Sequence, residues 1–140
     1  MKSVTLAEFK QFRPCWLADK AQAAKLEAIG RRKEHWTALD ILDLPPEEVS
    51  AKDKLWAVLR PELIDEAILH EFACRCAEEA LKLVEDPDPR SIAAIEAKRR
   101  WLRGEITDQE LDAAFAAAYD AGRAAARKTQ VEMPREMLAA

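Results

Sequence analysis

Apolar side chains recur along much of the chain at the three-to-four-residue spacing of amphipathic helices. The clearest segment runs from about Asp65 to Glu85, where one apolar stripe consists of Ile68, Phe72, Cys76, Ala80 and Leu83. Charged residues, among them Glu71 and Glu78, cover the opposite side of this helix. We therefore predict that it buries the apolar stripe at the centre of a helical bundle.

Start and stop signals divide the remaining chain into further helices. N-terminal capping signals occur at Thr5, Ser50, Asp88 and Thr107. Gly30 and Gly104 stand where glycine commonly ends a helix. No segment alternates with period two over the length of a strand. The predicted fold is an all-α, compact bundle of about six or seven helices without a sheet, in which helices 65–85 and 107–128 form a central pair crossed by 89–103.

The pattern predicts one helical domain over residues 1–140. Its parts are N-terminal helices in 1–46, a helical core in 50–128 and a tail in 129–140. The tail contains Val131, Met133, Pro134, Met137 and Leu138, and we expect it to dock on the bundle or to form a homodimer. Trp16, Trp36 and Trp56 are evenly spaced, but the residues around them differ, so we interpret the spacing as coincidence rather than a repeat.

Composition supports the helical prediction and narrows the function classes. The chain has 27 alanines and 3 glycines, and alanine is the best helix former. No apolar run is long enough for a signal peptide or a membrane span, and three cysteines without an export signal suit a reducing cytoplasm. The net charge of −4 argues against nucleic acid as a partner and suits a basic protein. We expect a soluble cytoplasmic protein.

The residues from His70 to Cys76 are the strongest candidates for metal or thiol chemistry. On a helix, Cys74 and Cys76 point about 200° apart, so they cannot share an ion, whereas His70 and Cys74 lie on one face. We interpret Cys76 as a small core residue and predict no catalytic, cofactor or metal site. A small metal- or thiol-dependent enzyme centred on His70 and Cys74 is the alternative in this class, and a four-ligand metal site would need both Cys15 and His35, or a carboxylate. The carboxylates at Glu85, Asp86 and Asp88 are interpreted as a solvated loop.

The basic run that ends near Gly104 contains the remaining candidate site residues: Arg99, Trp101 and Arg103. Arg99 falls between Ile92 and Ile95 on the apolar side of its helix. Because an unpaired buried guanidinium is costly, we predict a structural ion pair between Arg99 and an acidic residue of another helix. The alternative is that Arg99, with Trp101 and Arg103, lines a partner-binding groove.

These motifs carry a resemblance to a known family. The matching features over about 53–127 are Phe72–Glu78, the acidic loop Glu85–Arg90, Ala94–Ala97, the string Arg99-x-Trp101-x-Arg103-Gly104-Glu105-Ile106, and Arg123 with Arg127 in an alanine-rich last helix. The segment resembles the immunity proteins encoded near bacterial polymorphic toxins, although Tyr119 stands where the pattern has a histidine. The first 50 residues match nothing known.

The resemblance implies a non-enzymatic, protein-binding domain that neutralises a cognate toxin, and it assigns no active residue. The leading hypothesis is therefore a cytoplasmic immunity protein of bacterial or phage origin with a protein partner, expected to be a basic toxin. The runner-up is an accessory or assembly protein of a phage or mobile element.

Overall fold

The computed structural model describes residues 1–139, which divide into two compact units. Unit 1 is Met1–Leu69 and unit 2 is His70–Ala140. The boundary falls within one helix, between Leu69 and His70. The expected single domain over residues 1–140 stays a prediction, and each unit is described by itself below.

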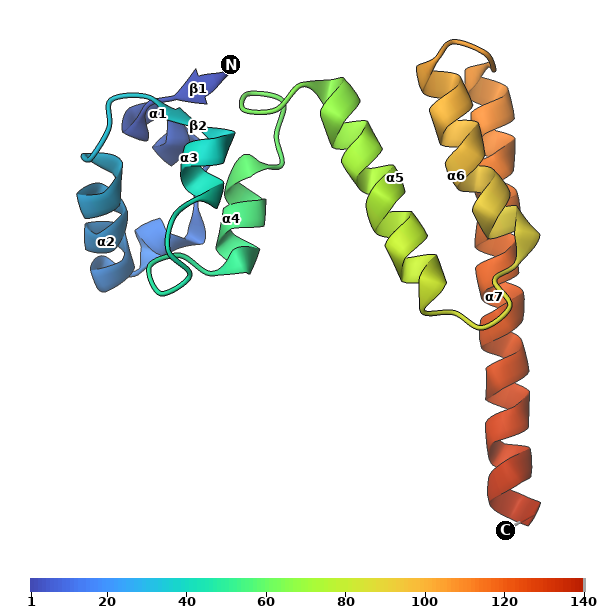
Figure 1. Ribbon diagram of the computed structural model, residues 1–140. Coiled ribbons are helices and arrows are strands. Elements are labelled where there is room, and N and C mark those ends of the chain that lie inside the picture. The colour runs from blue at the N-terminus through green and yellow to red at the C-terminus, as the bar shows by residue number, and fades with distance from the viewer. Residues whose placement is uncertain (140) are drawn as a thin grey trace. The chain divides into compact units, whose positions relative to one another are not determined.

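Helices dominate both units (Figure 1). In chain order the elements are β1 (Ser3–Val4), α1 (Leu6–Gln11), the 3-10 helix η1 (Cys15–Ala18), α2 (Lys20–Gly30), β2 (Trp36–Thr37), α3 (Ala38–Leu42), α4 (Ala51–Val58), α5 (Glu66–Lys82), α6 (Pro89–Leu102) and α7 (Asp108–Ala139). The seven α-helices within residues 1–139 confirm the predicted fold class.

One part of the fold prediction is wrong, because β1 and β2 form a small antiparallel sheet. Ser3 pairs with Thr37, and Val4 pairs with Trp36. Two-residue strands are too short to produce a visible period-two alternation, so the sequence pattern could not reveal them.

Unit 1 packs around a core of large apolar side chains. The buried members are Val4, Ile29, Trp36, Ile41, Val49, Val58 and Leu63, together with Ala38 and Ala57. The indole Nε1 of Trp36 donates a hydrogen bond of 3.1 Å to the carbonyl oxygen of Gly30, so the polar atom of this buried ring is satisfied. Unit 1 thus has a hydrophobic core of its own.

Two capping boxes fix helix starts in unit 1. The side chains of Thr5 and Glu8 bond reciprocally at the start of α1, which confirms the predicted box. Thr37 and Asp40 do the same at the start of α3. The Lys33 ammonium, followed by the Thr37 backbone N–H, lowers the pKa of Asp40 to about 2. Each box therefore holds an acidic side chain in place at a helix N-terminus.

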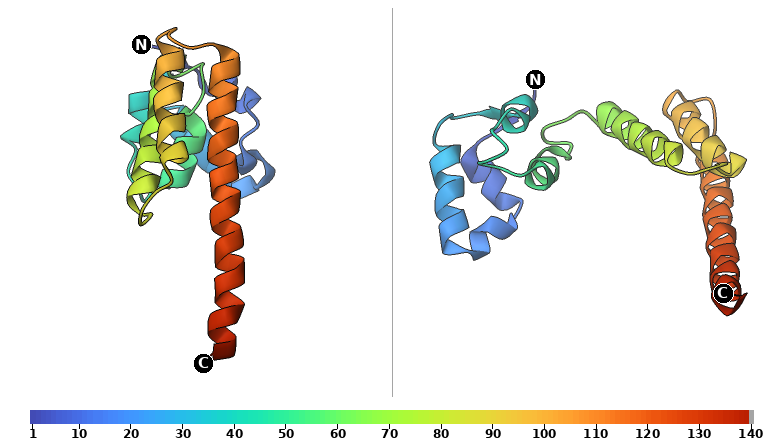
Figure 2. Two further views of the ribbon diagram at one scale, coloured as in Figure 1. Left: turned by 90° about the vertical axis from the view of Figure 1, so that its right-hand side faces the viewer. Right: turned by 60° about the horizontal axis from the view of Figure 1, so that its bottom comes forward.

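Unit 2 contains a helical hairpin made by α6 and α7, which lie side by side in every view (Figures 1 and 2). Asp88 caps α6 with Pro89 in its first turn, as predicted, and Gly104 at φ 72° allows the turn that follows. Ala94 and Ala121 are buried between the two helices together with Leu111. The expected central pair of 65–85 and 107–128 is wrong, because α7 packs principally against α6.

Helix α7 also extends further than predicted. It continues through the expected tail, with Pro134 inside it, and ends at Ala139. Every side chain from residue 122 to residue 139 is exposed, so the described part of the tail does not dock on unit 2. After Gly122 the sequence offers no glycine to end the helix, and Lys128 forms an i,i+4 ion pair of 3.8 Å with Glu132. Among residues 1–139, no helix combines the length and apolar character needed to cross a membrane.

Candidate protein-binding surface

The apolar stripe of α5 faces solvent. Ile68 is 60% exposed, Phe72 is 39% exposed and Leu83, just after the helix, is 90% exposed. Cys76 and Ala80 between them are also exposed. The prediction that this stripe packs at the centre of a bundle is therefore wrong. We call the five residues Ile68, Phe72, Cys76, Ala80 and Leu83 the α5 apolar face.

The opposite side of α5 turns inward, roughly half a helical turn away from the α5 apolar face. Cys74 is only 4% exposed, and Glu71, Glu78 and Leu81 are half-buried. The interpretation of Cys76 as the small core residue is thus wrong, since Cys74 takes that place. Carboxylates are seldom buried without a partner, and the partner of Glu71 and Glu78 lies on α6.

Arg99 of α6 holds this side of α5. Its Nη2 lies 3.1 Å from Glu71 Oε1, its Nε donates to Glu71 Oε2 at 3.3 Å, and its Nη1 pairs with Glu78 Oε1. The hydrogen bonds that Arg99 donates to Glu78 and then to Glu71 raise the pKa of Arg99, and Arg99 lowers the pKa of both carboxyl groups. A guanidinium clamped between two carboxylates fixes which side of α5 meets α6.

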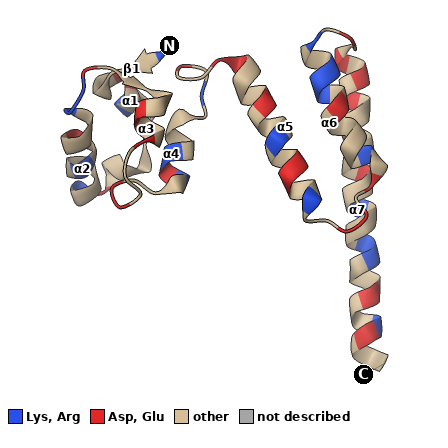
Figure 3. Ribbon diagram, in the orientation of Figure 1, with Lys and Arg blue, Asp and Glu red and all other residues tan. Residues whose placement is uncertain are grey.

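The charged residues of α5 and α6 are distributed in a way that allows these pairs. Figure 3 shows acidic and basic positions alternating along α5 and basic positions on α6. Because Glu71 and Glu78 must face Arg99, the α5 apolar face is left pointing away from α6. The structural role of these ion pairs and their alternative role in a partner-binding groove both stay predictions.

Trp101 connects α6 to its neighbours on both sides. Its indole Nε1 donates to Asp108 Oδ1 at 2.7 Å, and the Lys98 ammonium lies 4.2 Å from the ring centroid. The ring of His70 on α5 meets it edge to face with centroids 6.0 Å apart. Trp101 therefore contacts both α5 and the start of α7.

Arg103 pairs within its own hairpin. Its Nε lies 2.8 Å from Glu105 Oε1, and its Nη2 lies 3.5 Å from Glu96 Oε1. The structure thus places Arg99 and Trp101 against α5, and it places Arg103 at the turn between α6 and α7.

A groove runs beside the Arg99 pairs between α5 and α6, with a volume of about 430 Å³. Its lining includes Leu81, Val84, Ile92, Ile95, Glu78 and Arg99. Arg99 therefore takes part in an ion pair and also lines a groove, and the binding of a partner in that groove stays a prediction.

The candidate metal and thiol residues divide between the units. Cys15 and His35 belong to unit 1, whereas His70 and Cys74 belong to unit 2. Burial raises the pKa of the Cys74 thiol, which opposes formation of a reactive thiolate. Over residues 1–139, no group of three or more histidine, cysteine or acidic side chains is arranged to hold a metal ion.

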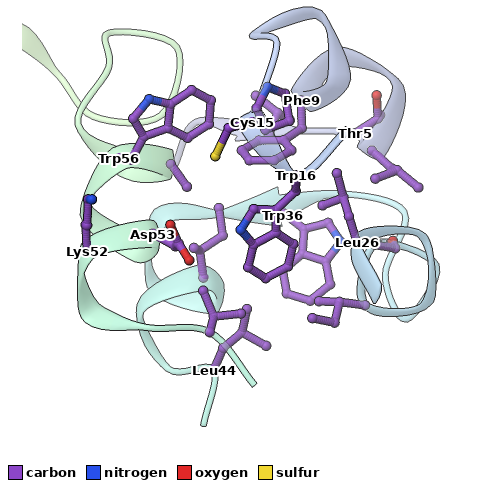
Figure 4. A pocket seen from close by; sticks show the side chains of 18 residues that line it. Thr5, Phe9, Cys15, Trp16, Leu26, Trp36, Leu44, Lys52, Asp53 and Trp56 are labelled. Carbon is purple, nitrogen blue, oxygen red and sulfur yellow. Dashed lines mark hydrogen bonds between the residues drawn. The ribbon is translucent and has the colours of Figure 1, made fainter. Parts of the chain in front are cut away.

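Sequence reasoning missed a cavity in unit 1. Trp16, Trp36 and Trp56, whose even spacing was interpreted as coincidence, all line it (Figure 4). The three rings come from η1, β2 and α4, and no local sequence pattern indicated that these elements would meet around one cavity.

Comparison with known protein families finds one match. Residues 61–137 match the family described as "Imm-5 like putative immunity protein". This segment begins before α5 and ends near the end of α7, so it includes the α5 apolar face, the Arg99 pairs and the hairpin. The match confirms the resemblance drawn from the C-terminal motifs. No curated protein and no solved structure matches the chain.

Proposed function

The chain belongs to the Imm-5 like family of putative immunity proteins, and from this premise we propose that it neutralises a cognate toxin protein in the cytoplasm by binding it through the α5 apolar face. The observation that carries the proposal is the exposure of that face within the segment that defines the family. Contiguous exposed apolar side chains mark interaction surfaces in soluble proteins.

The geometry of α5 favours a partner that covers this face. Phe72 stands near the middle of the stripe, with Ile68 and Leu83 toward its two ends. Aromatic side chains are frequent anchors in protein interfaces, where their large apolar area is withdrawn from water. Because Arg99 fixes the opposite side of the helix, the stripe is held ready for a partner and need not rotate outward first.

Charge around the face favours a basic partner. Acidic side chains outnumber basic ones five to one between residues 78 and 88, at the C-terminal end of α5 and in the loop after it. Such a cluster attracts a positively charged surface and speeds its approach. A basic toxin with an apolar anchor site fits this arrangement.

Binding without catalysis fits the chemistry of unit 2. The one cysteine beside a histidine on α5 has a raised thiol pKa, and the ring of that histidine, His70, lies against Trp101. Neither group is placed as an activated nucleophile requires. We therefore propose a stoichiometric inhibitor of the toxin.

The test begins with affinity purification from the native host, followed by reconstitution of a binary complex from the two purified proteins. We expect one basic protein in a fixed stoichiometry. Expressing that protein alone should arrest growth of a host strain, and co-expressing this chain should restore it. A captured protein that is harmless when expressed, or toxicity that persists despite co-expression, would overturn the proposal.

Two variants of equal exposure locate the surface. Phe72→Asp places a charge on the α5 apolar face, and we expect it to weaken toxin binding about thirtyfold or more, as for an interface anchor. Leu42→Asp in unit 1 is the matched control, because Leu42 is likewise 39% exposed. Equal loss of affinity in both variants would show that the α5 apolar face is not the binding surface.

A further inference from the structure

Unit 1 contains a cavity of about 210 Å³ whose walls are mainly apolar and include four aromatic rings. Trp16, Trp36, Trp56 and Phe9 contribute rings from η1, β2, α4 and α1 respectively (Figure 4). The volume lies below the ~300–1,000 Å³ of typical drug-sized sites, so the cavity suits a small ligand. This region lies outside the family match at residues 61–137.

A carboxylate points into this aromatic cavity. Asp53 is the third residue of α4, and its backbone N–H donates to Ser50 Oγ at 3.2 Å. At the equivalent position of other helices, Glu8, Asp40 and Glu110 each accept a hydrogen bond back from the capping residue. Among residues 1–139 the carboxylate of Asp53 makes no such bond and no ion pair; it is directed toward the cavity.

Two charged residues line the cavity, Asp53 and Lys52, and no ion pair joins them. Lys52 also lines the cavity, but Figure 4 shows its ammonium on the outer side of α4. Lys25, Lys33 and Arg60 lie 5.5, 6.0 and 4.6 Å from the centroids of Trp16, Trp36 and Trp56, and none of them lines the cavity. The space therefore combines electron-rich ring surfaces with one negative charge.

From the three tryptophans and the unpartnered Asp53 that share this cavity, we propose that unit 1 binds a small alkylated ammonium group. Aromatic rings attract a cation through their quadrupole, and a weakly hydrated quaternary ammonium loses little on leaving water. Asp53 supplies the balancing charge. The group could be carried by a free small molecule or by a trimethylated lysine side chain, which share this chemistry.

The test uses two probes of the same shape on the full, unaltered chain. Choline carries a quaternary nitrogen, and 3,3-dimethylbutan-1-ol has a neutral carbon in its place. In titrations followed by tryptophan fluorescence, we expect choline to bind about tenfold more tightly. N-acetyl-trimethyllysine methylamide forms a third arm, and its affinity relative to choline distinguishes the two sources of the group.

Nuclear magnetic resonance locates the binding. Choline should shift the indole N–H resonances of Trp16, Trp36 and Trp56, whereas Trp101 in unit 2 serves as an internal control. Asp53→Asn should reduce the preference for choline to about threefold or less. Asp43→Asn is the control, because Asp43 is exposed in unit 1 and does not line the cavity.

The proposal is overturned if neither ammonium probe binds, or if the alcohol binds as tightly as choline. It is also overturned if only Trp101 shifts, or if a folded Asp53→Asn chain keeps the full preference. The probe comparison and the indole shifts are measured on the unaltered chain, so they decide the matter even if the variant fails to fold. Toxin binding is a separate measurement, and its failure would leave this result intact.

Discussion

The two units bury different kinds of side chain. Unit 1 encloses Ile29, Trp36, Ile41, Val58 and Leu63, whereas the buried residues described in unit 2 are Cys74, Ala94, Leu111 and Ala121. Both units also expose some large apolar residues, which in unit 2 lie mainly along α5 and α7. Burial of apolar area is the main force that stabilises a fold. The difference teaches that unit 1 is held by a core of large apolar side chains, whereas the buried residues described in unit 2 are few and mostly small.

The polar contacts differ in the same sense. In unit 1 the ion pair between Arg32 and Glu48, at 2.5 Å, lies on the surface of a unit already held by its core. In unit 2 the Arg99 pairs link α5 to α6, and Arg99 itself is half-buried. Charged pairs thus lie at the surface of unit 1, whereas in unit 2 they connect two helices directly.

The largest effect should come from removing a core ring of unit 1. Trp36→Ala should lower the free energy of unfolding by about 3–5 kcal/mol, because it leaves a cavity and frees the Gly30 carbonyl oxygen. The matched control is Trp101→Ala in unit 2, where the ring is only half-buried and the loss should be smaller. Urea unfolding measures both. Equal decreases in the free energy of unfolding for the two variants would show that the two units do not differ in how much they depend on a buried ring.

A bound toxin should stabilise unit 2 in particular. At a free toxin concentration of about 100 Kd, binding should add about 2.7 kcal/mol to the free energy of unfolding. Hydrogen exchange read by mass spectrometry should show slower exchange in α5 and unchanged exchange in α2 and α4. Protection confined to unit 1 would contradict both the contrast and the proposed surface.

Acid should weaken the contact between α5 and α6. Arg99 lowers the pKa of Glu78 and, with a further contribution from Arg75, that of Glu71. The stabilisation is therefore complete above the ordinary glutamate pKa of 4.5 and is lost as the pH falls through the lowered values. Thermal unfolding followed by far-UV circular dichroism at a series of pH values should show a melting temperature that decreases once the pH is below about 4.5.

Arg99→Met tests the origin of that acid response. The variant should melt a few degrees lower at pH 7 and lose the part of the pH dependence that comes from Glu71 and Glu78. The contribution of Asp40 in unit 1 should persist until much lower pH, since its pKa is about 2. A folded variant at least as stable as the parent would exclude a structural role for Arg99.

The smallest effect on stability should come from the end of α7. Deleting residues 129–140 should change the free energy of unfolding by less than about 0.5 kcal/mol, because the described side chains there are exposed. If the tail forms a homodimer, as the sequence predicts, light scattering should show a dimer for the parent and a monomer for the deletion. Equal oligomeric states would refute that dimer.

Helix positions were predictable because their signals are local. The boxes at Thr5 and Thr107 and the cap at Asp88 lie next to the helices they start. The family resemblance likewise rests on a continuous string around Arg99 and Trp101. The two-residue strands were not predictable, since their pairing joins segments more than thirty residues apart.

The predicted orientation of α5 is wrong for a physical reason. Periodicity identifies the apolar side of a helix, but it assumes that this side packs within the same chain. Two carboxylates that bond one guanidinium on α6 decide the orientation instead, and their partner lies more than twenty residues away. The sequence indicated that Arg99 needs an acidic partner, but not that Glu71 and Glu78 would turn the apolar face outward.

The outer part of α7 leaves room for evolutionary change. Over residues 122–139 no described side chain belongs to a core, so substitutions there meet few folding constraints. A helix of this length spans about 27 Å. New side chains could therefore accumulate along that span without unfolding either unit.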